Sequence, residues 1–282
     1  MQKATLIKWA GKLVLYLLAV VVSLVFVAPF VWVAVTSLKV DTEIYRVPIT
    51  LFPQRLVFDQ YEHVLREMRE FTLYFLNTVI VSIASLAIVL LLSSLAGYAF
   101  GCLSFRGNRV LLTLVLLVLT IPYAVYLIPV FILENRLDLV DRRLGLILPY
   151  VALNLPLAMF IMRGTFRNIP TELQDAARID GAGHAQTWYR VMVPIAMPGV
   201  ATTGIFTFVM VWSEFMFARA LMLSRKAYTL PIGITFLQSE AQSWNFGVLA
   251  AAIVLTLLPV LVVFLLLQRF LVKGIMEGAL KG

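Results

Sequence analysis

The chain has 282 residues, of which 61% are hydrophobic and 13% are charged, and its mean hydropathy is +0.94. A soluble domain of this length carries about twice that share of charged residues, so the composition excludes an ordinary water-soluble protein. The apolar stretches are continuous and do not alternate with polar residues, which excludes a transmembrane barrel. The net charge of +8 is typical of membrane-protein loops that face anionic lipid, and it does not indicate nucleic-acid binding. The single cysteine, Cys102, excludes an internal disulfide bond.

Six apolar stretches approach or exceed the roughly 20 residues that a helix needs to cross a bilayer. Lysines precede the first stretch, as in a secretory signal, but the stretch is too long for one, and we expect it to remain as a span. The sequence therefore predicts an all-α integral membrane protein with one transmembrane domain over residues 1–282 and both termini on the same side. The predicted spans cover residues 13–38, 71–101, 110–133, 144–162, 195–221 and 247–270.

The loops indicate the orientation only weakly. If the N-terminus lies inside the cell, Lys and Arg divide almost evenly between the two sides, whereas most acidic residues fall outside. Since orientation depends mainly on Lys and Arg, charge favours the N-inside arrangement only slightly. The first outer loop, residues 39–70, contains a charged amphipathic stretch, YEHVLREMRE, which predicts a short surface helix.

Two spans carry features that matter for packing. Ser93, Gly97 and Gly101 recur at a spacing of four, which places them on one helix face and allows another helix to approach closely. The fourth span contains Pro149 and Pro156, and Pro259 interrupts the sixth. These prolines fit hinged helices around a transport pathway and equally well the general abundance of proline in membrane helices.

Residues 163–194 form a polar segment between the fourth and fifth spans. Thr171, with Gln174 three residues later, predicts a capping box at the start of a short helix. On that helix Leu173, Ala176, Ala177 and Asp180 share a face, and the two alanines make its centre shallow enough for a partner to contact the backbone.

Gly181 and Gly183 are expected to stop this helix, because glycine readily adopts the left-handed conformation of a helix end. A second short helix over residues 184–192 then turns Trp188 and Tyr189 towards the membrane or a partner, and prolines 194 and 198 end it. The segment is suited to transmit a push from a cytoplasmic protein. The residues alone fit an amphipathic hairpin resting on the bilayer equally well.

The order Asp175-Ala176-Ala177, Gly181 and Val191-x-Val193-Pro194 resembles the EAA loop of bacterial ABC importer permeases. In that family the loop is a coupling helix that docks in a groove of the ATP-binding subunit. The chain departs from the pattern with Asp175 for glutamate and with valines 191 and 193 for isoleucine and leucine. By this resemblance the residues that contact the ATPase are Glu172, Asp175, Ala176, Ala177, Asp180, Gly181, Val191 and Pro194.

Further motifs are similar to permeases of the carbohydrate-uptake type, among them Ala96-Gly97-Tyr98-Ala99 and Trp212-Ser213-Glu214-Phe215. The chain end resembles that of the smaller permease subunit of maltose-type transporters, whose tail reaches the ATPases, which assigns this contact to Lys281 and Gly282. The resemblance implies the type I importer architecture in a bacterial or archaeal cytoplasmic (inner) membrane, with the termini and the coupling loop in the cytoplasm. It also implies four partners: a larger permease subunit in a heterodimer, two ATP-binding subunits that hold ATP and Mg, and an extracytoplasmic solute-binding protein.

Three polar residues inside the predicted spans are candidates for the pathway or for interhelical ties: Glu214, Asn77 and Asn154. Glu214 would lie about 12 Å from the outer end of its span, and an acid at that depth must face protein or water. No pair of histidines has the spacing of metal ligands, and no phosphate-binding loop of the type G-x-x-x-x-G-K-[ST] is present. We therefore expect a transport subunit that is not an enzyme and that holds neither metal nor cofactor.

The function that these patterns favour is the permease subunit of a binding-protein-dependent ABC importer, which moves a sugar or oligosaccharide inward by ATP-driven alternating access. One alternative is the same machine with another polar cargo, such as a glycerol phosphate. An ion-coupled secondary carrier needs coupling acids at mid-membrane, for which Glu214 alone is thin support. A membrane scaffold that recruits a cytoplasmic protein through the same loop is a third alternative.

Overall fold

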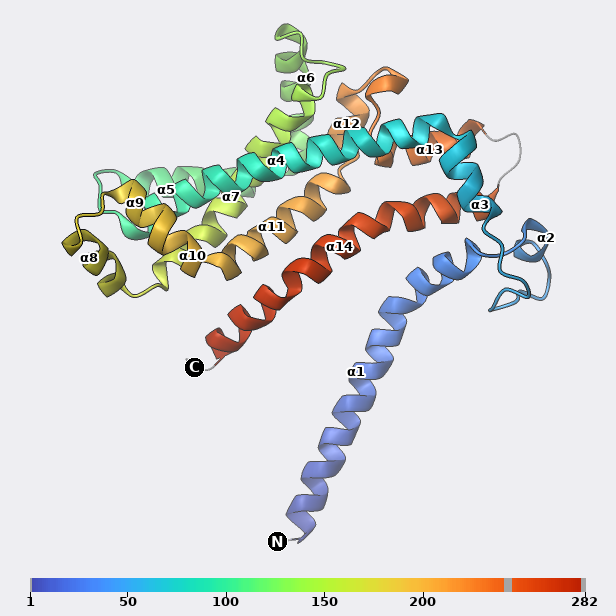
Figure 1. The fold of residues 1–282 in the computed structure, drawn as a ribbon, viewed down its shortest axis with the longest axis horizontal. Coiled ribbons are helices and arrows are strands. Elements are labelled where there is room, and N and C mark those ends of the chain that lie inside the picture. Colours follow the sequence, from blue (N-terminus) through green and yellow to red (C-terminus); the bar gives the residue numbers. More distant parts are fainter. Residues whose placement is uncertain (1, 241–244, 280–282) are drawn as a thin grey trace. The chain divides into compact units, whose positions relative to one another are not determined.

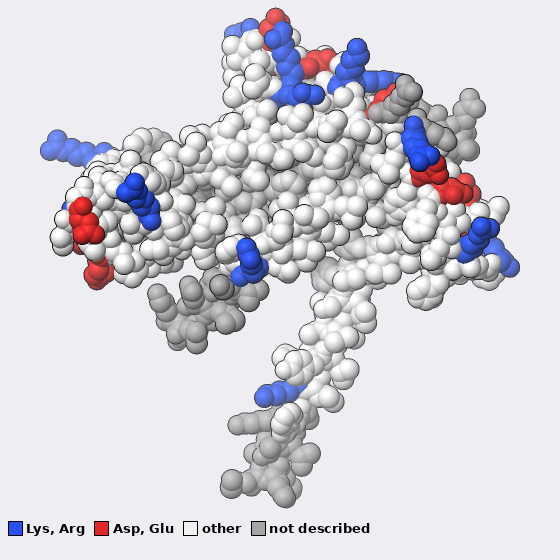
Figure 2. Space-filling view, in the orientation of Figure 1, with Lys and Arg blue, Asp and Glu red and all other residues white. Residues whose placement is uncertain are grey.

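The structure, a computed structural model, describes residues 2–240 and 245–279, which are largely helical and contain no strand. The expected all-helical architecture is confirmed for this part of the chain. Four helices are long and apolar enough to cross a membrane, over Gly11–Thr36, Glu70–Cys102, Leu144–Arg167 and Phe246–Phe270. Two bent helix pairs raise the number to six if each pair is one span. On the face shown in Figure 2, uncharged side chains cover most of the long helices.

The contacts divide the chain into two compact units, residues 1–69 with 236–255 and residues 70–235 with 256–282. In the first unit a polar segment follows helix α1 and folds on itself. Buried Glu43 accepts hydrogen bonds from the Thr50 hydroxyl at 2.8 Å and from the Gln54 amide at 3.0 Å, and Asp41 accepts one from Asn245 at 3.1 Å. The predicted surface helix is present as α3 and η1. The elements here are α1 (Gln2–Thr36), α2 (Asp41–Ile44), α3 (Asp59–Glu62) and the π-helix η1 (His63–Glu67).

The second unit is built around α4 (Arg69–Cys102), α7 (Leu144–Arg167) and α11 (Met197–Trp212), which run side by side (Figure 1). Small residues allow this close packing. A Cβ at Gly97 of α4 would lie 2.6 Å from the Met162 Cβ, and one at Gly101 would lie 3.1 Å from the Arg163 carbonyl oxygen. The predicted face of small residues on the second span is therefore confirmed, and its partner is α7. The chain closes with α13 (Leu230–Glu240) and α14 (Phe246–Ala279).

The third predicted span is not one continuous helix. The structure has α5 (Asn108–Leu117) and η2 (Val118–Thr120), then η3 (Tyr123–Tyr126) and α6 (Leu127–Arg136), with a bend of 97° between the two halves. Pro122 causes the break, because it lacks an amide hydrogen and forces the preceding residue, Ile121, out of the helical conformation. The stretch predicted as the third span, residues 110–133, is therefore divided into two helical halves.

The fifth predicted span is also divided. Helix α11 meets the helix before it at 79°, with Pro198 in its first turn, and it ends at Trp212. After a break at residues 213–215 the chain forms the short helix α12 (Met216–Leu221). The Ser213 hydroxyl bonds the Val209 carbonyl at 2.7 Å, a contact that competes with regular helix geometry. The stretch predicted as the fifth span, residues 195–221, is therefore divided as well.

The prolines that the sequence analysis singled out do not break their helices. Helix α7 continues through Pro149 and Pro156, and α14 continues through Pro259. Helix α7 also runs past its predicted end at Met162 and stops at Arg167, shortly before Pro170.

Candidate functional site

The polar segment between α7 and α11 folds into a group of short helices at one end of the second unit (Figure 1). Its first helix, α8, does not begin as predicted. Pro170 occupies the N-cap position, and no side chain caps the helix. Gln174 is instead buried close to the Cys102 thiol at the end of α4, so the predicted capping box is wrong. The elements are α8 (Thr171–Ile179), α9 (His184–Thr187), the π-helix η4 (Trp188–Met192) and α10 (Val193–Ile195).

Helix α8 ends in a left-handed turn at Gly181, whose φ is +80°. The Gly181 amide donates to the Arg178 carbonyl at 3.0 Å, and the Ala182 amide donates to the Ala177 carbonyl at 2.9 Å. This pair of bonds is the Schellman arrangement that satisfies the last carbonyls of a helix. Gly181 therefore stops the helix as predicted, whereas Gly183 is the N-cap of α9.

One face of α8 is open and the other packs on the chain. Gln174 and Ala177 face inward, and Ala177 is only 8% exposed. The sequence analysis placed Ala177 on the same open face as Ala176, and the structure corrects this. The residues accessible to a partner are Glu172, Leu173, Asp175, Ala176, Ile179 and Asp180, with Ile179 86% exposed.

The open face of α8 therefore has an apolar centre bordered by acidic side chains. Leu173, Ala176 and Ile179 form the centre, because they recur at a spacing of three residues. Asp175 pairs with Arg178 on the same helix at 3.5 Å, and both side chains are exposed. Because such a pair in water contributes little to stability, both groups remain available to a docking protein.

Both ends of the segment are held by a buried group of side chains that we call the anchor cluster. Ile169 enters it from the start of the segment and Met192 from the end. Tyr98 and Phe166, from α4 and α7, meet edge to face in it with their ring centroids 5.9 Å apart. The segment that contains α8 is therefore packed on α4 and α7 at both of its ends. The members of the anchor cluster are Tyr98, Met162, Phe166, Ile169, Met192 and Ala196.

Trp188 belongs to this inner side, although the sequence analysis directed it to the membrane or a partner. Its indole nitrogen donates to the Ser94 hydroxyl of α4 at 3.0 Å, and its ring packs on the anchor cluster. Tyr189 does face outward and is half-exposed. Val191 is half-buried in η4, and Pro194 is exposed in α10.

Glu214 lies in the break between α11 and α12, so its predicted depth in a continuous helix does not apply. Its carboxylate accepts the Phe217 amide at 2.8 Å and the Ala218 amide at 3.0 Å, which are free donors at the start of α12. The Tyr150 hydroxyl of α7 donates to the same carboxylate at 2.5 Å. Glu214 thus connects α7 to α12 within the chain. The side-chain nitrogen of Asn154 donates to the Tyr150 carbonyl of its own helix, at 2.8 Å.

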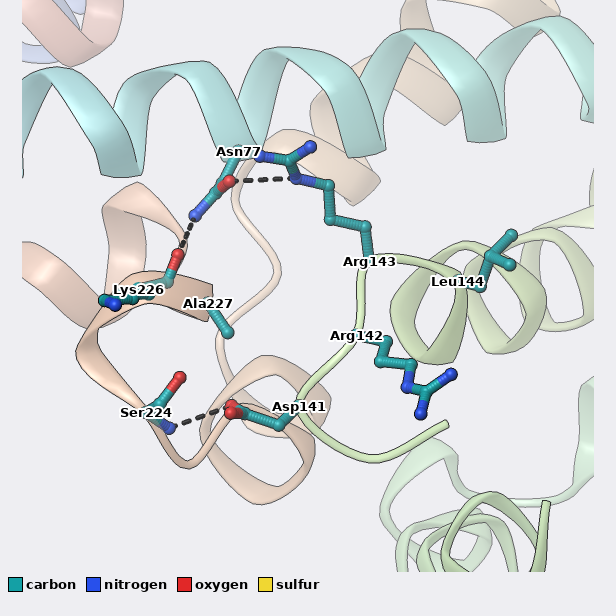
Figure 3. Close-up of a pocket in the computed structure, with 8 residues that line it drawn as sticks. All are labelled: Asn77, Asp141, Arg142, Arg143, Leu144, Ser224, Lys226 and Ala227. Carbon is teal, nitrogen blue, oxygen red and sulfur yellow. Dashed lines mark hydrogen bonds between the residues drawn. The ribbon is translucent and has the colours of Figure 1, made fainter. Parts of the chain in front are cut away.

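Asn77 connects three segments beside a cavity of about 390 Å³ (Figure 3). Its amide nitrogen donates to the Lys226 and Tyr228 carbonyls, both at 2.9 Å, and its oxygen accepts the Arg143 Nε at 3.0 Å. The sequence analysis named Asn77 but missed the cavity. The available signal was a group of cations in two predicted outer loops.

Asp141 holds one wall of the cavity. Its Oδ1 accepts the amides of Leu223 and Ser224, both at 2.8 Å. Burial raises the pKa of Asp141, but the hydrogen bonds from Ser224 and Leu223 outweigh burial and hold this pKa below its usual value. The carboxylate is therefore ionised near neutral pH.

Two further predictions from the sequence concern the end of the chain and metal binding. The predicted ATPase contacts at Lys281 and Gly282 lie outside the described residues. Within residues 2–240 and 245–279, no group of three or more His, Cys, Asp or Glu side chains could hold a metal ion.

Comparison with known proteins relates this arrangement to a family. Residues 93–277 match the family described as binding-protein-dependent transport system inner membrane component. Over 274 residues, 97% of this chain and 95% of the relative, the chain is 33% identical to a sulfoquinovosyl glycerol transport system permease of Agrobacterium fabrum. It is 34% identical over 260 residues (92% and 85%) to a diacetylchitobiose uptake permease of Streptomyces coelicolor. It is 33% identical over 255 residues (90% and 92%) to a trehalose transport permease of Mycobacterium tuberculosis.

The fold also has a counterpart among solved structures. A chain of a bacterial ABC transporter that imports the acidic polysaccharide alginate matches with a TM-score of 0.80 and 22% identity, over 92% of this chain and 96% of the other. The helical arrangement is therefore that of an importer permease. The chain belongs to the family of binding-protein-dependent transport system inner membrane components, and it is a transport subunit, not an enzyme.

Proposed function

We propose that this chain is one of two permease subunits of an importer that moves a saccharide into the cell by alternating access, driven by ATP on partner subunits. The cargo class rests on the relatives, which are permeases for sulfoquinovosyl glycerol, diacetylchitobiose and trehalose. Their cargoes differ in charge and size but share a sugar, so we assign the class and not the individual compound.

The open apolar centre of α8 is the observation that carries the proposal. Leu173, Ala176 and Ile179 are exposed on a helix of the polar segment, and both ends of that segment are held in the anchor cluster. A groove on an ATP-binding subunit would bury these side chains, and closure of the two ATPases around ATP would then displace α8. Because the anchor cluster joins the segment with α8 to α4 and α7, these two helices would tilt and open the translocation pathway outward. Hydrolysis of ATP would return these helices to the inward-facing arrangement.

The remaining parts of the assembly follow from the same role. A second, larger permease would complete the translocation pathway, and the two ATP-binding subunits would hold ATP and Mg. The segment with α8 and both termini would face the cytoplasm, where Lys281 and Gly282 would contact the ATPases. The segment of residues 222–246 would face outward and meet the solute-binding protein.

Cysteine crosslinking tests the coupling role with a matched pair. In the assembled complex, Ala176→Cys should crosslink to a cysteine in the groove of the ATPase, because Ala176 is exposed. Ala177→Cys should crosslink far less, because this neighbour is 8% exposed and faces the chain. Absence of a crosslink from residue 176 under every nucleotide condition would contradict the coupling role and favour a helix that rests on lipid.

Saccharide-stimulated ATP hydrolysis by the complex in vesicles tests the class of transporter. An ion-coupled carrier or a non-transporting scaffold would show no such stimulation.

A further inference from the structure

The cavity beside Asn77 lies at the end of α7 opposite to α8 (Figures 1 and 3). Helix α7 has 24 residues and starts at Leu144, on the cavity wall, and ends just before the segment with α8. At 1.5 Å per residue the helix is about 36 Å long, enough to cross the bilayer. If α8 faces the cytoplasm, as proposed above, the cavity opens on the outer side.

The walls of the cavity carry more positive than negative charge. Arg142, Arg143 and Lys226 line it, and Asp141 is the one acidic side chain among its lining residues. Asp141 already accepts two backbone amides, and within the described residues neither Arg142 nor Lys226 has an ion pair. Arg143 engages Asn77 through Nε alone, so its terminal nitrogens remain available. Among the described residues, the positive charge is therefore not neutralised.

The walls of the cavity are already held in place by hydrogen bonds within the chain, before any ligand binds. Asn77 is 1% exposed and bonds both the segment before α7 and the segment after α12. The Asp141 amide donates to the Leu221 carbonyl at 2.8 Å, a second connection between the same two segments. A ligand would therefore bind without first having to order these walls, which preserves affinity.

We propose that this cavity receives a carboxylate side chain of the solute-binding protein when that protein docks on the permease. The inference rests on the proposed function, which supplies the partner and the outward orientation. Guanidinium groups match the planar geometry of a carboxylate, and unpaired cations attract an acidic surface before contact, so the pairing directs docking. A phospholipid fits less well, because Leu144 and Ala227 are the only apolar lining residues and form no groove for acyl chains.

The test uses the whole reconstituted complex and its cognate solute-binding protein, purified with the saccharide bound. ATP hydrolysis is measured against the concentration of that protein at low and high salt. Arg142→Gln and Lys226→Gln should each raise its half-saturating concentration about threefold to fivefold at low salt, as for a partly exposed ion pair. The difference from wild type should shrink at high salt, because salt screens the attraction. Basal and maximal rates of ATP hydrolysis should not change, since neither side chain makes a hydrogen bond or an ion pair with the described residues.

Arg136→Gln is the matched control, because Arg136 is an exposed cation at the end of α6 that does not line the cavity. It should leave the half-saturating concentration unchanged. The proposal is overturned if the double variant Arg142→Gln/Lys226→Gln behaves like wild type, or if Arg136→Gln shifts the curve equally. It is also overturned if the variants change only the response to phosphatidylglycerol in the vesicles, which would identify a lipid headgroup, or only the uptake of an anionic saccharide. If the wild-type complex shows no stimulation at all, the proposed function fails first.

Discussion

Gly181 offers a direct test of whether the end of α8 must keep its left-handed turn. Its φ of +80° is a conformation that side chains with a Cβ adopt at a cost, while no described atom lies within 4 Å of the position that a Cβ would take. A substitution therefore meets no steric obstacle among the described residues, and its expected effect comes from the strain of the backbone.

The expected size of the effect follows from that geometry. Left-handed backbone costs an ordinary residue about 1–2 kcal/mol, and a β-branched residue lies at the upper end of that range or above it. About 2 kcal/mol lowers the equilibrium constant for the native turn roughly 30-fold, since 1.4 kcal/mol corresponds to a factor of ten. Gly181→Val should thus strongly reduce coupling. Gly181→Asn should retain most of it, because asparagine tolerates the left-handed conformation.

Both variants are compared in proteoliposomes by saccharide uptake and by stimulated ATP hydrolysis, with membrane insertion and complex assembly checked first. The reasoning would be refuted if Gly181→Val transported as well as wild type. Equal inactivity of the valine and asparagine variants would also refute it, because the cause would then be a steric block at the docked ATPase and not the backbone of this chain.

Two other substitutions test the packing around the site. Gly97→Ala should destabilise the protein by about 1–3 kcal/mol, because its Cβ would lie 2.6 Å from the Met162 Cβ and 2.9 Å from the Arg163 backbone nitrogen. Gly164→Ala, on α7 but open to space, should instead raise the thermal midpoint in detergent, and a lower midpoint for it would contradict the packing argument. Glu214→Gln removes a charged acceptor from the first amides of α12 and should lower the midpoint, by about 1–3 kcal/mol of stability, without changing cargo preference. A changed cargo profile at an unchanged midpoint would indicate that Glu214 lines the pathway.

Much of the local structure could be predicted from the residues because its causes are local. A long apolar stretch in lipid must satisfy its own backbone groups, so hydropathy alone predicted helices near α1, α4, α7 and α14. The left-handed end of α8 follows from Gly181, since glycine has no Cβ to oppose a positive φ. The close approach of α4 to α7 follows from Gly97 and Gly101.

The divided spans could not be predicted in this way. Average hydropathy across residues 110–133 and 195–221 does not register a break, although Pro122 is a local signal for the break in the first of these stretches. The break after Trp212 is tolerated because the Glu214 carboxylate accepts the freed amides of Phe217 and Ala218 and is itself held by Tyr150. Whether such a partner is present depends on a residue 64 positions away in the chain.

The residues alone identify a helical membrane permease with a polar segment between two of its spans. Packing in three dimensions sets which face of that segment is open. Ala176 and Ala177 are chemically identical neighbours, and they differ because the face of α8 that carries Gln174 and Ala177 packs on the chain whereas the face that carries Ala176 does not. The cationic cavity likewise depends on the tertiary structure. Its walls come from α4 and from two separate segments that are joined through Asn77 and Asp141. The periodicity of the sequence indicates which face of each helix is apolar. Packing between distant parts of the chain determines which element covers that face.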